Sequence, residues 1–220
     1  MEEEIILSRG EAFIRKYSRT LLIGVGSIAG AVALYLAAQS LYFVPRNARA
    51  ANDLFRAEHF FRQDSFTLAL HGNGADIAGF AKIADEYGSA PSANLAKGYA
   101  AICAYRLGEY ETALLFLEDF NTPDDGYFGP VATGLKGDCF ANLGEVKKAI
   151  GLFEKAARLA DNDLLSPTYL KKAAAAYESL EEYDKAASAY ARIKEKYYTS
   201  REAEDIDKYI TRAQLLHASK

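Results

Sequence analysis

Few residues in this sequence have types and spacings that could support chemistry. The three histidines, His59, His71 and His217, are far apart, and no two of them stand at metal-ligand spacing with a carboxylate. Residues 72–74, Gly-Asn-Gly, lack the Gly-Lys-Ser/Thr sequence that completes a phosphate-binding loop, so we interpret them as a turn. No serine or cysteine stands in a recognisable nucleophile motif. We therefore expect no enzyme activity, no cofactor and no metal site.

Acidic and basic residues are interspersed, and neither sign dominates the chain. The 220 residues include 26 basic and 30 acidic side chains, which give a net charge of −4. The two signs are interspersed, and no stripe of lysine and arginine offers a surface to a phosphate backbone. The sequence therefore predicts no nucleic-acid partner, and no motif points to a small-molecule substrate.

An uncharged apolar run, residues 21–44, follows a polar tail of residues 1–20. Its length exceeds the roughly 20 residues that a helix needs to cross the hydrocarbon core of a bilayer. A cleavable signal peptide is the alternative, since residues 48–50, Ala-Arg-Ala, resemble a cleavage site. The apolar part of a signal peptide is usually about 7 to 15 residues long, however. We therefore predict a retained transmembrane helix.

Basic residues lie on both sides of the predicted span. Four lie before it and three soon after it: Arg9, Arg15, Lys16, Arg19, Arg46, Arg49 and Arg56. Lysine and arginine favour the cytoplasmic side of a membrane. The slight excess before the span predicts a cytoplasmic amino terminus, with the rest of the chain outside the cytoplasm.

Internal repetition predicts the fold of the remaining chain. Residues 107–110, 143–146 and 180–183 align as turn signals with a period of about 36 residues. Small and large apolar residues recur at shared offsets from these turns: Ala101, Gly137 and Ala174; Ala113, Ala149 and Ala186; Leu117, Phe153 and Tyr190. Each unit is therefore predicted to be a pair of antiparallel helices. Neighbouring pairs must stack, because neither helix can bury its apolar face alone.

This pattern resembles the tetratricopeptide repeat. The middle unit matches best, between Gly137 and Ala156. The first unit departs by carrying Phe120 where a small residue is usual, and the third by placing Glu181 where glycine is usual. The resemblance implies an all-α fold, in which the transmembrane helix is followed by an α-solenoid of antiparallel helix pairs.

The predicted layout has five segments. They are a tail (1–20), a transmembrane helix (21–44), a degenerate first repeat with an insertion (45–92), three repeats (93–199) and a carboxy-terminal capping helix (200–220). In the degenerate repeat, glycine-containing residues 71–75 are expected to interrupt the second helix. Ser200 and the acidic residues after it are expected to start the capping helix, which carries Ile206, Tyr209, Ile210 and Leu215.

Cys103 and Cys139 are the two cysteines of the chain. A disulfide needs Cα atoms within about 7 Å of each other. The repeat alignment places both cysteines at the same position on the first helices of consecutive units, and stacked helices lie roughly 8 to 10 Å apart. We therefore predict two buried thiols.

Tetratricopeptide arrays usually bind partners in a concave groove lined by the first helices of their repeats. The repeat alignment transfers six residues to this groove, here called the groove residues: Tyr105, Arg106, Asp138, Asn142, Lys171 and Glu178. The alternative is an ordinary solvated face of mixed charge. One subtype of the family clamps a terminal carboxylate with lysine and asparagine. The corresponding first-unit positions here are Gly98 and Ile102, which do not support that mode.

The whole layout is similar to that of bacterial single-pass tetratricopeptide proteins related to the ancillary subunit of the SecYEG translocon. That resemblance implies an inner-membrane protein whose repeat domain faces the periplasm and associates with the Sec translocon and periplasmic chaperones. It favours an adaptor or chaperone-associated subunit at the export machinery. The alternative is a structural subunit of another envelope complex, in which the span and the outer face of the repeats make the contacts.

Overall fold

The computed structural model describes residues 2–88, 90–122 and 126–219, without the side chains of residues 2–16 and 21. The chain divides into two units, residues 1–49 and residues 50–220, and each is described by itself. The described residues form helices, turns and one isolated bridge between Gly72 and Ala78.

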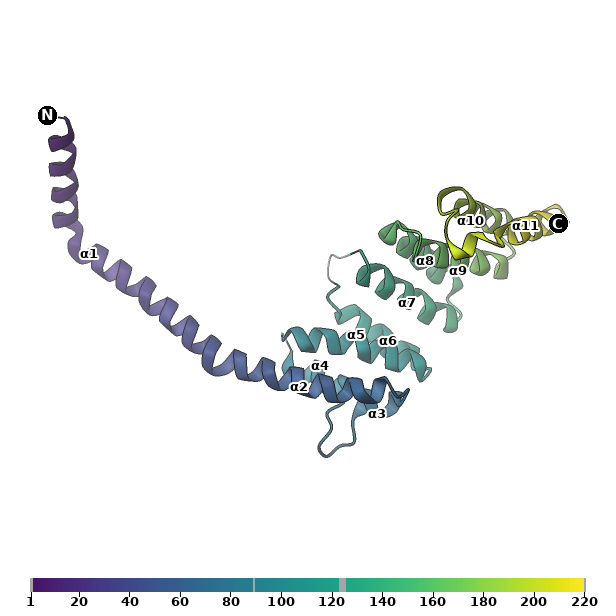
Figure 1. The fold of residues 1–220 in the computed structure, drawn as a ribbon, viewed down its shortest axis with the longest axis horizontal. Helices are drawn as coiled ribbons and strands as arrows, with labels where there is room; N and C mark the ends of the chain where they lie inside the picture. Colours follow the sequence, from purple (N-terminus) through teal and green to yellow (C-terminus); the bar gives the residue numbers. More distant parts are fainter. Residues whose placement is uncertain (1, 89, 123–125, 220) are drawn as a thin grey trace. The chain divides into compact units, whose positions relative to one another are not determined.

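The first unit is helical. Helix α1 runs from Glu2 to Ala38, a π-helical turn from Gln39 to Phe43 follows, and α2 begins at Val44 (Figure 1). The π-helical turn ends two residues before Pro45, which has no backbone N–H to donate to that turn. Residues expected to form a tail, 2–20, thus belong to α1. By length and composition, one described helix, Tyr17–Phe61, could cross a membrane, and its apolar window is fully exposed.

The second unit contains ten α-helices among the residues that the structure describes, arranged in succession in Figure 1. They are α2 (Val44–Phe61, from Ala50 onward), α3 (Phe66–His71), α4 (Phe80–Tyr87), α5 (Pro91–Arg106), α6 (Tyr110–Asp119), α7 (Phe128–Asn142), α8 (Val146–Ala160), α9 (Ser166–Ser179), α10 (Tyr183–Lys196) and α11 (Ile206–Ala218). The pairs α5/α6, α7/α8 and α9/α10 are the three aligned units.

The turns inside these pairs lie where the aligned signals place them. Gly108, Gly144 and Glu181 all have positive φ, at 81°, 79° and 58°. After each of them, a backbone N–H donates to the fifth residue back, as from Glu109 to Ala104 O at 2.9 Å. This arrangement satisfies carbonyls at the helix end. Glycine adopts the conformation without strain, whereas Glu181 adopts it at a cost.

Small residues permit the close packing of each pair. A Cβ atom added to Gly137 on α7 would lie 2.7 Å from Cε1 of Phe153 on α8. Ala101 and Ala174 occupy the aligned positions, and both are fully buried. The expectation that Gly137 lies where two helices touch is confirmed.

The degenerate unit has a broken second helix, as its glycines predict. Helix α3 ends at His71, and α4 begins at Phe80. Between them, the side-chain oxygen of Asn73 accepts backbone N–H groups of three later residues at 2.9 to 3.2 Å: Ala75, Asp76 and Ile77. A Cβ at Gly72 would lie 2.1 Å from the carbonyl oxygen of Ile77, so this loop requires glycine there.

The terminal helix begins later than expected. Ser200 precedes a short 3₁₀ helix, Arg201–Ala203, and α11 starts only at Ile206. The Ser200 hydroxyl donates to Tyr197 O at 2.7 Å and makes no cap hydrogen bond to the 3₁₀ helix, and Asp205 is the residue that precedes α11. Of the apolar residues that this helix carries, Ile206 is buried, whereas Leu215 is exposed.

The core of the second unit consists of two large hydrophobic clusters and a small one between them. The first cluster extends from α2 to α6 and includes Cys139 on α7, and the second extends from α8 to α11. The small cluster contains Ala101, Leu117 and Ala132 as its buried residues. Cys139 and the small cluster therefore supply the buried packing between the α5/α6 pair and α7.

Candidate functional site

The groove residues of the middle unit are close to neighbouring first helices. Asp138 on α7 accepts hydrogen bonds from Nζ of Lys172 on α9, with both carboxylate oxygens at 2.7 Å. Asn142, one turn later, donates through Nδ2 to the carbonyl oxygen of Asp138 at 2.8 Å. Asp138 thus joins two consecutive first helices and leaves little of its charge available to a partner.

The groove residues of the third unit pair with α11. Lys171 lies 3.6 Å from the Asp205 carboxylate and 4.6 Å from the centre of the Tyr209 ring. Glu178 accepts a hydrogen bond from Arg212 at 2.5 Å. Both ion pairs join residues 34 positions apart, as Asp138 and Lys172 do, so α11 packs as the first helix of a further repeat.

The groove residues of the first unit lie partly against the core. Tyr105 packs on the first hydrophobic cluster, and burial, followed by the nearby Asp138 charge, raises the pKa of its phenol. Arg106 is exposed and lies over the Phe66 ring, 5.9 Å from its centre. The structure therefore brings Tyr105, Asp138 and Asn142 together and places Lys171 and Glu178 beside α11. Their role in partner binding stays a prediction.

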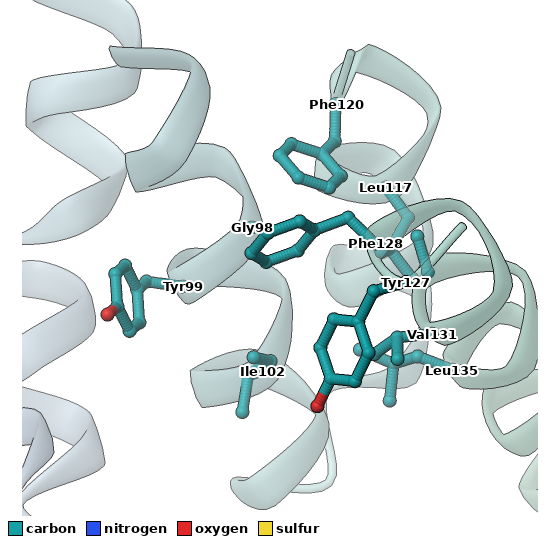
Figure 2. Close-up of a pocket in the computed structure, with 10 residues that line it drawn as sticks. Gly98, Tyr99, Ile102, Leu117, Phe120, Tyr127, Phe128, Val131 and Leu135 are labelled. Carbon is teal, nitrogen blue, oxygen red and sulfur yellow. The ribbon is translucent and has the colours of Figure 1, made fainter. Parts of the chain in front are cut away.

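An apolar pocket of about 260 Å³ lies between α5 and α7, beside the end of α6 (Figure 2). Its lining residues carry no charge: Gly98, Tyr99, Ile102, Leu117, Phe120, Tyr127, Phe128, Val131, Ala132 and Leu135. In Figure 2, the rings of Phe120, Tyr127 and Phe128 lie between the two helices, and those of Phe120 and Phe128 are beside Gly98. Tyr127 is 49% exposed and Phe128 is 40% exposed, so the pocket has an aromatic rim open to solvent.

At the next junction, between α7 and α9, an aromatic ring fills the space that corresponds to this pocket. A Cβ on Gly134 of α7 would lie 2.1 Å from Cε1 of Tyr169, whose ring packs from α9 and is buried. In the repeat alignment, Gly98 occupies the place of Gly134, and Ala132 occupies the place of Tyr169. Ala132 therefore supplies no ring to the α5/α7 junction. The Phe120 ring lies against Gly98 instead, 3.3 Å from an added Cβ, and the apolar pocket remains beside it.

The α7/α9 junction has an ion pair, whereas the α5/α7 junction has apolar side chains at the aligned positions. The alignment places Ile102 at the position of Asp138, and Leu135 at the position of Lys172. An ion pair at the α7/α9 junction is thus replaced by two apolar side chains at the α5/α7 junction. Sequence reasoning noted Gly98 and Ile102 only as residues unsuited to clamp a carboxylate. Comparison of aligned positions across the two junctions would have identified the pocket.

Both cysteines are buried free thiols, as predicted. Burial raises the pKa of Cys103 to about 12 and that of Cys139 to about 11. A thiol with so high a pKa is a poor nucleophile at neutral pH. Among the described residues, no group of three or more His, Cys, Asp or Glu side chains could hold a metal ion.

Comparison with solved structures identifies a TPR-like repeat fold. Two crystal structures of a Podosopora anserina protein, described as a kinesin light chain with nearly identical TPR-like repeats, each align with a TM-score of 0.58 and 12% identity. The alignments cover 79% of this chain and 89% of that chain. No family model matches the sequence, and no curated protein matches it. At this identity, the likeness shows the fold alone.

Proposed function

We propose that this protein is a membrane-anchored adaptor that binds a segment of another protein along the first helices of its TPR-like repeats. The repeat scaffold supports protein–protein interaction, and the exposed apolar helix Tyr17–Phe61 supports a membrane anchor. The observation that carries the proposal is the solvent-open apolar pocket between two first helices, because exposed apolar concavities mark interaction sites.

The finer proposal places the adaptor at the protein-export machinery of a bacterial inner membrane. It has a cytoplasmic amino terminus, a periplasmic repeat domain, and the Sec translocon and periplasmic chaperones as partners. Support comes from the layout of one apolar helix, a degenerate repeat and three further repeats, and from the slight excess of basic residues before the apolar run.

A structural subunit of another envelope complex is the second candidate. It would make its contacts through the span and the second helices. Leu115 on α6 and Leu159 on α8 are exposed and favour this alternative. These side chains would become buried in such an assembly.

Photo-crosslinking separates the two candidates. Probes at Tyr105 and Asn142, on first helices, should capture a protein partner in native membranes, and probes at the exposed Lys148 and Lys155 on α8 should capture it weakly. Replacing Tyr105 and Arg106 with alanine should reduce capture from the probe at Asn142. Equal capture from both helix faces, or capture through the span alone, would favour the structural subunit.

A further inference from the structure

We infer that the pocket between α5 and α7 receives one large uncharged side chain, an aromatic ring, from the bound polypeptide. This inference rests on the proposed function and specifies the chemical group that the partner presents. The partner segment lies along the first helices, and its ring enters between Ile102 on α5 and Phe128 on α7.

The size of the pocket suits a side chain. Its volume of about 260 Å³ is below the roughly 300 to 1,000 Å³ typical of clefts for drug-sized ligands. The α7/α9 junction gives a direct comparison, because there the ring of Tyr169 packs over Gly134. The α5/α7 junction has the same glycine position, Gly98, but Ala132 supplies no ring. The Phe120 ring lies against Gly98 less closely, 3.3 Å from an added Cβ, and leaves the pocket beside it. A ring from another chain can enter this remaining space.

The charge of the pocket selects the type of side chain. Its lining residues are uncharged, and Ile102 and Leu135 occupy the places of an ion pair at the next junction. A charged group entering this pocket would lose water and gain no counter-ion, which is costly. An uncharged ring loses little and can contact the aromatic rim edge-to-face or in an offset stack.

Binding of N-acetyl-L-phenylalaninamide tests the inference directly. This uncharged probe is added to the full-length chain in lipid nanodiscs, and the methyl NMR signals of Ile102, Leu117 and Leu135 are followed. We expect saturable shifts at these methyl groups. N-acetyl-L-alaninamide and the ionised N-acetyl-L-aspartic acid amide should leave the same signals unchanged at equal concentration.

Two variants alter the lining of the pocket in different ways. The double variant Ile102→Asp with Leu135→Lys copies the ion pair of the next junction, and Phe128→Ala removes an exposed part of the rim. Each should weaken probe binding by about tenfold or more. Tyr198→Ala, which removes an exposed ring outside the pocket, is the matched control and should leave binding unchanged. Phe128→Ala keeps the test valid if the double variant fails to fold.

Crosslinking from Tyr105 separates failure of the inference from failure of the proposed function. Capture that falls in Phe128→Ala and persists in Tyr198→Ala supports the pocket. Capture that is equal in both variants, or the absence of shifts with the phenylalanine probe, overturns the inference and leaves the adaptor proposal standing. Absence of capture in the unmodified chain overturns the adaptor proposal, and the inference with it.

Discussion

The junction between α5 and α7 and the junction between α7 and α9 have the same repeat geometry but different side chains. At the α7/α9 junction, Tyr169 fills the space over Gly134, and Asp138 pairs with Lys172. At the α5/α7 junction, the aligned side chains are small or apolar, and a pocket remains. A few differences at aligned positions therefore distinguish a closed contact between repeats from an open pocket.

At the α7/α9 junction, we expect the Tyr169 ring to contribute more to packing stability than the Asp138–Lys172 ion pair does. The Asp138 and Lys172 side chains are 20% and 40% exposed, and an ion pair at such a surface contributes about 0 to 1 kcal/mol. Tyr169 is buried, and burial raises the pKa of its phenol to about 12. We therefore expect the two junctions to differ mainly in what fills the space between the helices.

Removal of the filling ring should have the largest effect. Tyr169→Ala should lower the free energy of unfolding by about 3 to 5 kcal/mol, the range seen when a large buried ring is truncated. Phe128→Ala, at the rim of the open junction, should cost less than about 1 kcal/mol, because the ring is already partly exposed. Chemical denaturation of both variants measures the difference. Equal losses would show that the two junctions are packed alike.

Glycine substitutions should also distinguish tight from open packing. Gly137→Leu should lower the free energy of unfolding by about 1 to 3 kcal/mol, because the new side chain meets the buried Phe153 ring. Gly98→Leu should cost less, since a Cβ there lies 3.3 Å from the half-buried Phe120 ring and the new side chain can extend into the pocket. Thermal unfolding of the two variants provides the test. An unchanged unfolding temperature for Gly137→Leu would show that the repeats are aligned incorrectly.

Loss of the ion pair should have the smallest effect. Lys172→Ala should lower the free energy of unfolding by about 0 to 1 kcal/mol, and the loss should shrink as salt screens the pair. Denaturation at low and high ionic strength measures both effects. A loss as large as that of Tyr169→Ala would show that charge, and not the ring, closes the α7/α9 junction.

The repeating parts of the fold could be predicted because they depend on local signals. The turns at Gly108, Gly144 and Glu181 and the close approach at Gly137 follow from residue types at fixed offsets. The two buried cysteines follow from the same alignment. Periodicity is informative here because each unit repeats the same helix-to-helix contact.

The candidate site was less predictable because it depends on pairings between units. The sequence placed Lys171 and Glu178 in a groove, but Asp205 and Arg212, 34 positions later, pair with them in the structure. Likewise, an apolar residue such as Ile102 has the same appearance in a sequence whether it lies in a core or lines a pocket. That Ala132 has no ring becomes informative only when it is compared with Tyr169 at the aligned position.

The most direct test compares aligned exposed positions at the two junctions. Tyr127, just before α7, and Leu164, just before α9, occupy aligned positions of their repeats, and both side chains are exposed. A photo-crosslinking amino acid is placed at each position in the full-length chain in native membranes. We predict capture of a protein partner from position 127 and little or none from position 164. Equal capture from both positions, or capture from position 164 alone, would contradict an open binding site between α5 and α7.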